Sequence, residues 1–440
     1  MNTSMNRREF LGVSSAAGGM LAAGYFVNPA AAAPSKSPGE KLNIAAVGTM
    51  NRAGANIGAV AAAGENIVAL CDVDANLLGR AAQKYSKARK YRDFRVMLEK
   101  EAEKIDAVLV GTPDHTHAPA AAMALRLGKH VYCEKPLAHT VLEARTMAEL
   151  AKKKNLVTQM GTQIHSGDNY RRVVELVRGG AIGKVRKSHV WVNVSYGGAR
   201  LKTGSPAPKH LDWDLWLGPA PKRSYSAGVH PFNWRRFWDY GTGGLGDFGC
   251  HYMDLVHWAL DLRHPTTITA RGPKVDPIAT PSWLEVDYHH PRRGDLPAVD
   301  LTWQDGGRRP KILSQLRDAG GKPLNWGSGQ LFIGEQGMIL SNYSQHVLLP
   351  AKKFAGFDRP KQSIPRSIGH QREWLHAIKS GGTTTCNFDY SGALAEAVLL
   401  GNVAYRSGKK IEWDAKNLKV TNAPAAQQFV HTEYRKGWAL

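Results

Sequence analysis

Cysteine is scarce in this 440-residue sequence, and its four cysteines stand singly at Cys71, Cys133, Cys250 and Cys386. No pair has the C-x-x-C spacing of a zinc site or a redox motif, and no cluster suggests a disulfide framework. We therefore predict buried free thiols and no metal centre.

Long basic runs are also missing, although 58 Lys and Arg against 37 Asp and Glu give a formal net charge of +21. The longest such run is the three lysines at residues 152–154. Charge spread this evenly produces a diffuse positive field, not the concentrated patch of a nucleic-acid groove. We expect no nucleic-acid partner, and the field suits an acidic glycan, an anionic small molecule or the cell envelope.

The apolar stretch near the N-terminus, residues 11–27, is too short and too rich in small side chains for a stable membrane-spanning helix. A twin arginine at residues 7–8 precedes it, and an alanine-rich stretch at residues 30–33 follows it. This order is typical of a twin-arginine export signal with a cleavage region. We predict a signal and linker over residues 1–40, export to the periplasm or cell envelope, and no membrane span in the mature protein.

An apolar run at residues 42–47 ends at Gly48 and predicts a buried parallel strand. The glycine turn and small-residue helix that follow outline a dinucleotide fingerprint, with Met50 where a second glycine normally stands. Asp72 ends the next apolar strand about 20 residues later, where ribose hydroxyls are read. Its charge would repel a 2′-phosphate, so NAD is favoured over NADP; an ordinary helix cap is the other interpretation.

Two further strand ends carry polar residues. Residues 105–110 lead into a segment with Pro113, His115 and His117, and residues 129–133 lead into Glu134 and Lys135. Open α/β sheets bind ligands at the carboxyl ends of their strands. We therefore place Glu134 and Lys135 at a ligand cleft, with a surface ion pair as the alternative, and interpret His117 as a cofactor contact and His115 as structural.

Strands alternate with helices over residues 41–163, which predicts a right-handed, doubly wound parallel sheet of the Rossmann type. Residues 164–440 contain several spaced strands that predict a large, mainly antiparallel open sheet, with helices at 370–380 and 391–407 packed on it. The predicted fold class is α/β, with an α+β second domain.

A glycine-rich loop at residues 241–246 leads into a helix that carries Asp247 and His251. Residues four apart project from one helix face, and Asp254 lies three further along the same side. Imidazole is the commonest general acid–base at neutral pH, and a nearby carboxylate orients it. This segment predicts proton-transfer chemistry.

The motif Glu134-Lys135-Pro136, the Asp247-x-x-x-His251 helix and the order of the two domains resemble the Gfo/Idh/MocA family of glucose–fructose oxidoreductases and inositol dehydrogenases, in its exported twin-arginine branch. The resemblance implies a catalytic trio, which is Lys135, Asp247 and His251. It also implies a set of NAD-contacting residues, which we predict to be Gly48, Met50, Asn51, Arg52, Asp72, Thr112, Pro113, His117, Glu134 and Lys135. The predicted substrate contacts are His165, Asn193, Trp234 and Arg235.

Four tryptophans, Trp213, Trp216, Trp234 and Trp238, lie in a Pro- and Gly-rich stretch at residues 197–240. They either anchor a long loop onto the core or stack on sugar faces.

We expect an oxidoreductase that acts on a secondary alcohol of a sugar, glycoside or cyclitol, and a homo-oligomer by family likeness. Because a periplasm has no nicotinamide pool, NAD should be held tightly.

Three alternatives remain open. The first is an NAD-dependent glycoside hydrolase or lyase that works by transient C3 oxidation, elimination and re-reduction. The second is redox-neutral hydride exchange between two sugars. The third is a binding protein with an inactive cofactor site, which the unusual Met50 would explain.

Overall fold

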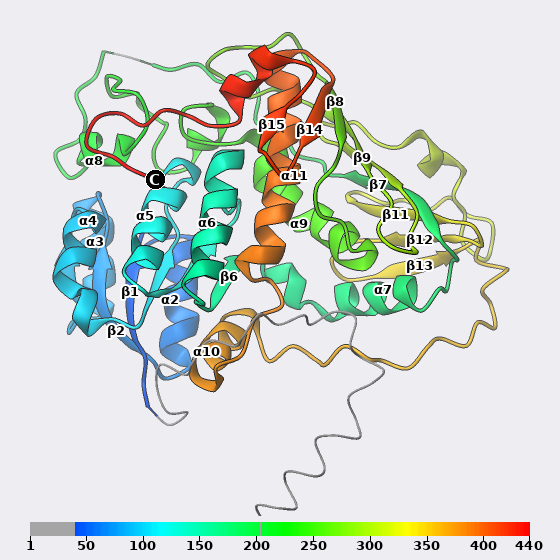
Figure 1. Ribbon diagram of the computed structural model, residues 1–440, viewed down its shortest axis with the longest axis horizontal. Helices are drawn as coiled ribbons and strands as arrows, with labels where there is room; N and C mark the ends of the chain where they lie inside the picture. Colours follow the sequence, from blue (N-terminus) through cyan, green and yellow to red (C-terminus); the bar gives the residue numbers. More distant parts are fainter. Residues whose placement is uncertain (1–39, 203) are drawn as a thin grey trace, which may run out of the picture.

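The computed structural model describes residues 40–202 and 204–440. The predicted twin-arginine signal therefore lies almost wholly outside the described residues. Two sheets organise the remainder, with helices packed between them (Figure 1).

The first sheet has six strands in the order β3-β2-β1-β4-β5-β6, and its neighbouring strands are parallel. These strands are β1 Asn43–Val47, β2 Asn66–Cys71, β3 Arg89–Tyr91, β4 Ala107–Val110, β5 His130–Glu134 and β6 Thr158–Gly161. Its connecting helices are α2 Arg52–Ala62, α3 Ala75–Lys84, α4 Phe94–Glu101, α5 Asp114–Arg126 and α6 Val141–Lys153. The central strands are almost continuously buried because helices cover both faces. This arrangement confirms the predicted doubly wound sheet.

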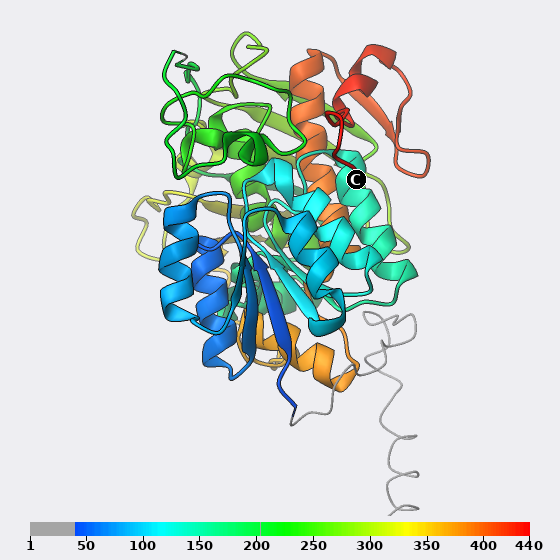
Figure 2. The same cartoon turned by 90° about the vertical axis from the view of Figure 1, so that its left-hand side faces the viewer.

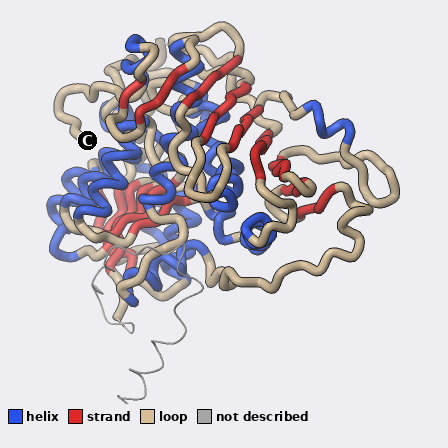
Figure 3. The backbone as a smooth tube through the Cα atoms, turned by 45° about the vertical axis from the view of Figure 1, so that its right-hand side comes forward, coloured by secondary structure: helices blue, strands red, loops and turns tan. Residues whose placement is uncertain are grey.

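The second sheet has nine strands in the order β13-β12-β11-β7-β10-β9-β8-β14-β15. These are β7 Val185–Trp191, β8 Thr267–Arg271, β9 Glu285–His290, β10 Val299–Gln304, β11 Gly329–Gly334, β12 Met338–Ser341, β13 His346–Leu349, β14 Ile411–Asp414 and β15 Lys419–Val420. Strands β7 and β10 pair in parallel, and the other neighbours pair antiparallel, as predicted for a mainly antiparallel sheet. Figure 3 shows its strands apart from the parallel set.

Two long helices, α9 and α11, connect the two domains. The remaining α-helices are α7 Asp168–Arg178, α8 Trp213–Leu217, α9 Gly243–Leu260, α10 His370–Ser380 and α11 Phe388–Ser407. The 3-10 helices are η1 Ala102–Lys104, η2 Gln163–Ser166, η3 Asn233–Arg236, η4 Lys311–Gln315 and η5 Pro424–Phe429. Helix α11 packs against α6 of the first domain and α9 of the second (Figure 1). One continuous core therefore positions α9 relative to the parallel sheet.

Helix α10 corrects a sequence-based expectation, because it packs on the parallel sheet and not on the second one (Figure 2). Trp374 is fully buried, and its ring centroid lies 5.8 Å from that of Tyr132 on β5. An amphipathic pattern predicts a buried face but does not specify which apolar surface covers it.

All four cysteines are buried and unbridged, which confirms their predicted state. Among the helices of the described chain, none is both long and apolar enough to cross a bilayer.

Candidate active site

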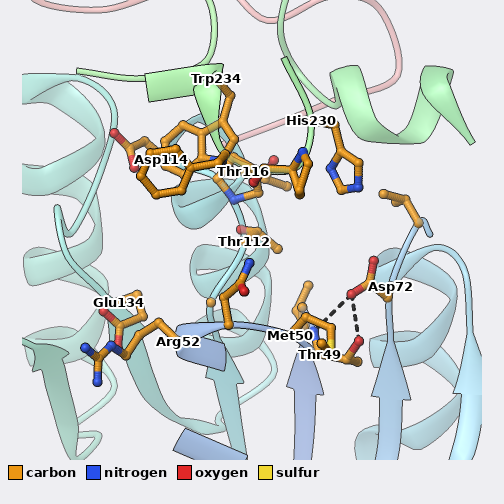
Figure 4. Close-up of a pocket in the computed structure, with 18 of the residues that line it drawn as sticks. Thr49, Met50, Arg52, Asp72, Thr112, Asp114, Thr116, Glu134, His230 and Trp234 are labelled. Carbon is orange, nitrogen blue, oxygen red and sulfur yellow. Dashed lines mark hydrogen bonds between the residues drawn. The ribbon is translucent and has the colours of Figure 1, made fainter. Parts of the chain in front are cut away.

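A cavity of about 820 Å³ lies between the parallel sheet and the start of α9. Its walls come from the carboxyl ends of the parallel strands and from the stretch before α9 (Figure 4). Residues of α9 form the rest. The location follows the rule that open α/β sheets bind ligands at the carboxyl ends of their strands.

The turn after β1 shapes one wall. Gly48 has φ +86°, and a Cβ there would stand 2.8 Å from the carbonyl oxygen of Gly111, so a side chain would not fit. Helix α2 begins just beyond, after Asn51 at φ 52°, and no described side chain caps its N-terminus. An uncapped helix N-terminus attracts phosphate. The turn therefore fits a dinucleotide despite Met50, which lines the cavity with Arg52.

Asp72 lies at the end of β2 and faces the same cavity. Its carboxylate accepts hydrogen bonds from the backbone N–H (3.0 Å) and hydroxyl (2.8 Å) of Thr49 (Figure 4) and from the N–H of Asp74 (3.0 Å). Asp74, not Asp72, caps α3 by accepting from Asn76 and Leu77. A carboxylate has room for about four such bonds. Asp72 can therefore accept one more hydrogen bond, from a ribose hydroxyl. The helix-cap interpretation applies to Asp74 and not to Asp72.

Glu134 ends β5 beneath the cavity. Its carboxyl accepts hydrogen bonds from Asn56 Nδ2 (2.7 Å) and Gln163 Nε2 (2.8 Å). A Cβ on Gly161 would stand 2.5 Å from that carboxyl, so a side chain there would displace Glu134 from its present position. Burial raises the pKa of Glu134. The residue therefore joins β5 to α2 and η2 at the cavity.

An ionic cluster joins the two domains at the cavity. Lys135 Nζ donates to the carboxylate of Asp247 and, over 2.9 Å, to its backbone carbonyl. The hydroxyl of Tyr196 donates to the same carboxylate over 2.6 Å, and Arg235 Nε approaches it at 3.3 Å. Burial alone would raise the pKa of Asp247, but the charges of Lys135 and Arg235 outweigh burial and hold this pKa well below its usual range. Asp247 is therefore an ionised anchor for Lys135.

His251 lies one turn further along α9 and lines the cavity. Across residues 40–202 and 204–440, no hydrogen-bonding partner reaches its Nδ1. Burial, followed by the charge of Lys135, lowers the pKa of His251 to about 3. The imidazole is consequently neutral at physiological pH. The carboxylate of Asp247 holds Lys135 in place.

The cavity residues missed from the sequence include two polar side chains near the ionic cluster, Asp114 and Tyr196. Asp114 is only 2% exposed and accepts a hydrogen bond from Thr242 Oγ1 over 2.7 Å. Burial, then the nearby charge of Asp247, raises the pKa of Asp114 to about 7. Its position directly after Pro113, at a strand end, was a usable signal. Tyr196 follows β7 in an irregular stretch, and nothing local marks it.

Three predicted contacts, His117, His165 and Asn193, do not line the cavity. Both ring nitrogens of His117 engage backbone carbonyls, those of Pro136 (2.8 Å) and Thr112 (2.7 Å), so it ties two turns together beneath the cavity. His165 is 0% exposed, with Nδ1 2.9 Å from Asp254. Asn193 is exposed beyond β7, and its backbone N–H donates to Ser328.

The other predicted site residues all line the cavity, and they are Gly48, Met50, Asn51, Arg52, Asp72, Thr112, Pro113, Glu134, Lys135, Trp234, Arg235, Asp247 and His251. Trp234 is buried under the guanidinium of Arg235 at 4.1 Å. Trp213 and Trp216 stack on each other at 4.6 Å, so this pair anchors the long loop, although Trp216 also borders the cavity.

Comparison with known families agrees with this geometry. Residues 42–162 match a family model described as an oxidoreductase family with an NAD-binding Rossmann fold, and residues 181–294 match that family's C-terminal alpha/beta domain. The two matches cover more than half of the chain. The protein belongs to the Gfo/Idh/MocA oxidoreductase family.

Several curated relatives are dehydrogenases of small polyols. The levoglucosan dehydrogenase of Pseudarthrobacter phenanthrenivorans is 27% identical over 43% of this chain and 41% of its own length. The myo-inositol 2-dehydrogenase of Thermotoga maritima is 29% identical over 33% of this chain and 40% of its own length. A glycosyl hydrolase family 109 protein of Saccharopolyspora erythraea is 27% identical over 68% of this chain and 63% of its own length. The chain thus matches about two fifths of the length of the first two relatives.

Solved structures share the fold. The WlbA dehydrogenase from Bordetella pertussis, in complex with NADH and UDP-GlcNAcA, superimposes with a TM-score of 0.59 at 17% identity, over 85% of this chain and 99% of that one. An aldose–aldose oxidoreductase from Caulobacter crescentus gives a TM-score of 0.55 at 17% identity, over 85% and 100% of the chains. These likenesses confirm the two-domain α/β architecture.

Proposed function

We propose that the protein is an NAD-dependent oxidoreductase that acts on a secondary alcohol of a sugar, glycoside or cyclitol. One observation carries the proposal: Lys135 from the parallel sheet and Asp247 from α9 form an ion pair in the cavity that His251 also lines. A cation and a neutral base in one cleft are what removal of a hydroxyl proton requires.

The roles follow from charge and hydrogen bonding. NAD, when bound, supplies the acceptor for a hydride from the carbinol carbon. His251 takes the hydroxyl proton through its neutral imidazole, and the ammonium of Lys135 stabilises the developing alkoxide. Asp247 holds Lys135 in place. The turn at Gly48, the α2 N-terminus and Asp72 would hold the dinucleotide.

A carbohydrate substrate is supported by the lining before α9 and by the relatives. Phe232 is 53% exposed and lies with Trp234 and Arg235 along the cavity. Exposed aromatic faces suit the apolar faces of sugar rings. The relatives include dehydrogenases of levoglucosan and myo-inositol.

The test is reduction of NAD by the purified protein across a panel of sugars and cyclitols. Lys135→Ala and His251→Ala should each lower kcat by roughly 10² to 10⁴-fold while NAD remains bound, measured by mass spectrometry of the released cofactor. Lys129→Ala is a matched control, because Lys129 lies at the opposite end of the same strand. Unchanged turnover in the Lys135 variant would contradict the proposed chemistry.

A second candidate is an NAD-dependent glycoside hydrolase, supported by the family 109 relative that matches 68% of this chain. In that reaction the C3 hydroxyl of the sugar is first oxidised to a ketone, which makes the C2 proton acidic. Loss of that proton and of the group held by the glycosidic bond creates a double bond. Water then adds to the double bond, and the ketone is reduced again. The cofactor undergoes no net change. Release of phenol from aryl glycosides without added NAD would favour this candidate, whereas NADH accumulation with free sugars would favour the first.

We further propose export by the twin-arginine route to the periplasm or cell envelope, on the strength of the residue order at the N-terminus. Fractionation of cells that express the full chain, with Arg7→Lys/Arg8→Lys as the comparison, tests it: the exported fraction should disappear in the double variant.

A homo-oligomer is proposed by family likeness, and light scattering of the purified protein tests that.

A further inference from the structure

The C-terminal segment, residues 434–440, packs against helices of the first domain and reaches the cavity at Trp438. Trp438 lines the cavity beside Asp93 and Phe94, which follow β3, and the same end contains Asp72 and Arg92. In dinucleotide folds the acid at the end of the second strand reads the adenosine ribose. This end of the cavity is therefore the adenosine end.

We propose that Trp438 forms a wall of the adenine-binding site and that residues 434–440 act as a strap that slows release of the cofactor. The inference rests on the proposed NAD-dependent function and adds a binding element that lies 366 residues beyond Asp72 in the chain. It predicts a site that recognises the adenine half of the cofactor through stacking.

The strap is tied to four elements of the structure. The hydroxyl of Tyr434 donates to Glu143 on α6 over 2.6 Å, and Arg435 pairs with Asp214 on α8 over 2.8 Å. Arg95 on α4 donates to the carbonyl of Gly437 over 2.8 Å. Arg126 on α5 donates to the carbonyl of Leu440 over 2.7 Å. These contacts hold the segment in one path along the helices.

The indole itself has the environment of a stacking surface. Its ring centroid lies 5.8 Å from that of Phe94, and the guanidinium of Arg95 lies 4.1 Å above the ring. Arg95 is in turn held by Asp93 at 2.6 Å. Trp438 is only partly buried although it is the largest side chain of the segment, and part of its surface borders the cavity. Nucleobases stack on such aromatic surfaces.

The experiment separates the two halves of the cofactor. Affinities of AMP, ADP-ribose, NAD and nicotinamide mononucleotide are measured by calorimetry for the full chain, Trp438→Ala and Trp438→Phe. Stacking of a base on an aromatic side chain predicts roughly tenfold weaker binding of AMP, ADP-ribose and NAD to Trp438→Ala. Trp438→Phe should recover most of the affinity, and nicotinamide mononucleotide should bind all three proteins equally. NADH should also leave Trp438→Ala roughly tenfold faster in stopped-flow displacement.

Trp283→Ala is the matched control, because Trp283 is another partly buried indole with a guanidinium 4.1 Å away, that of Arg308, and it does not border the cavity. Trp438→Leu keeps an apolar group against Phe94 without an aromatic face, and serves if the alanine variant does not fold; it should show the same loss of AMP affinity.

The outcomes distinguish the two proposals. If the unaltered protein binds NAD and AMP, and Trp438→Ala or Trp438→Leu binds them equally well, the strap inference is overturned while the proposed function stands. An equal loss for nicotinamide mononucleotide would also overturn it, because that pattern indicates general damage. Absence of nicotinamide binding in the unaltered protein would instead refute the NAD-dependent function.

Discussion

Helix α9 carries two acid clusters seven residues apart, and they differ in access. Asp247 pairs with Lys135 and accepts from Tyr196 at the wall of the open cavity. Asp254 lies two turns further on and is 0% exposed. It contacts His165 Nδ1 at 2.9 Å and accepts from the hydroxyl of Tyr390 over 2.7 Å.

The two clusters contain the same kinds of groups: a carboxylate, a nitrogen base or cation, and a tyrosine hydroxyl. The second cluster is sealed, since His165 stacks on Trp258 at 4.0 Å and Tyr390 comes from α11. It ties η2, α9 and α11 together. Chemical type and helical spacing therefore do not distinguish a reactive site from a structural joint; access to a cavity does.

The largest predicted difference comes from removing one charge in each cluster. Asp247→Asn should lower kcat per folded molecule by roughly 10² to 10³-fold, because Lys135 loses its anchor. Asp254→Asn should leave kcat per folded molecule nearly unchanged but lower the free energy of unfolding by roughly 3 kcal/mol, because it breaks a buried pair. Steady-state kinetics and urea unfolding measure both. The comparison fails if Asp254→Asn loses turnover as strongly as Asp247→Asn.

Removing one hydroxyl from each cluster should give a smaller version of the same contrast. Tyr196→Phe deletes a hydrogen bond to Asp247, and we expect a roughly tenfold fall in kcat, which corresponds to a bond to a charged group. Tyr390→Phe should cost about 1 to 2 kcal/mol of stability with kcat retained. Equal kinetic effects of the two substitutions would show that the sealed cluster also acts on the reaction.

The smallest predicted effect concerns Asp114, which belongs to the open cluster. Its pKa is raised from 3.8 to about 7, so the folded state favours the neutral acid, and its contribution to stability is lost as pH rises from about 4 through about 7. An asparagine side chain does not ionise, so the stability of Asp114→Asn should not fall in this way as pH rises. The variant should match the unaltered protein at pH 4 and exceed its free energy of unfolding by a margin that grows up to pH 8.

Urea unfolding across that pH range measures the Asp114 effect, with Asp295→Asn as the control because Asp295 is exposed. A stability difference that does not grow with pH would show that Asp114 is ionised throughout, and the open cluster would then hold two charged carboxylates.

Local features were predictable because they depend on neighbours in the chain. Apolar runs predict buried strands, the turn at Gly48 predicts a dinucleotide site, and the spacing of Asp247 and His251 predicts one helix face. Each of these predictions required only the period of a strand or helix and the conformational freedom of glycine. The family resemblance added that Lys135 and Asp247 meet.

The sequence by itself thus determined the two-sheet architecture, the nucleotide turn and the pair on α9. Only the tertiary structure decided that His165 is sealed against Asp254, that Tyr196 completes the open cluster, that α10 covers the parallel sheet, and that Trp438 returns to the cavity. The physical reason is that periodicity defines which side of an element is apolar, whereas burial and partners depend on the distant surface that covers it.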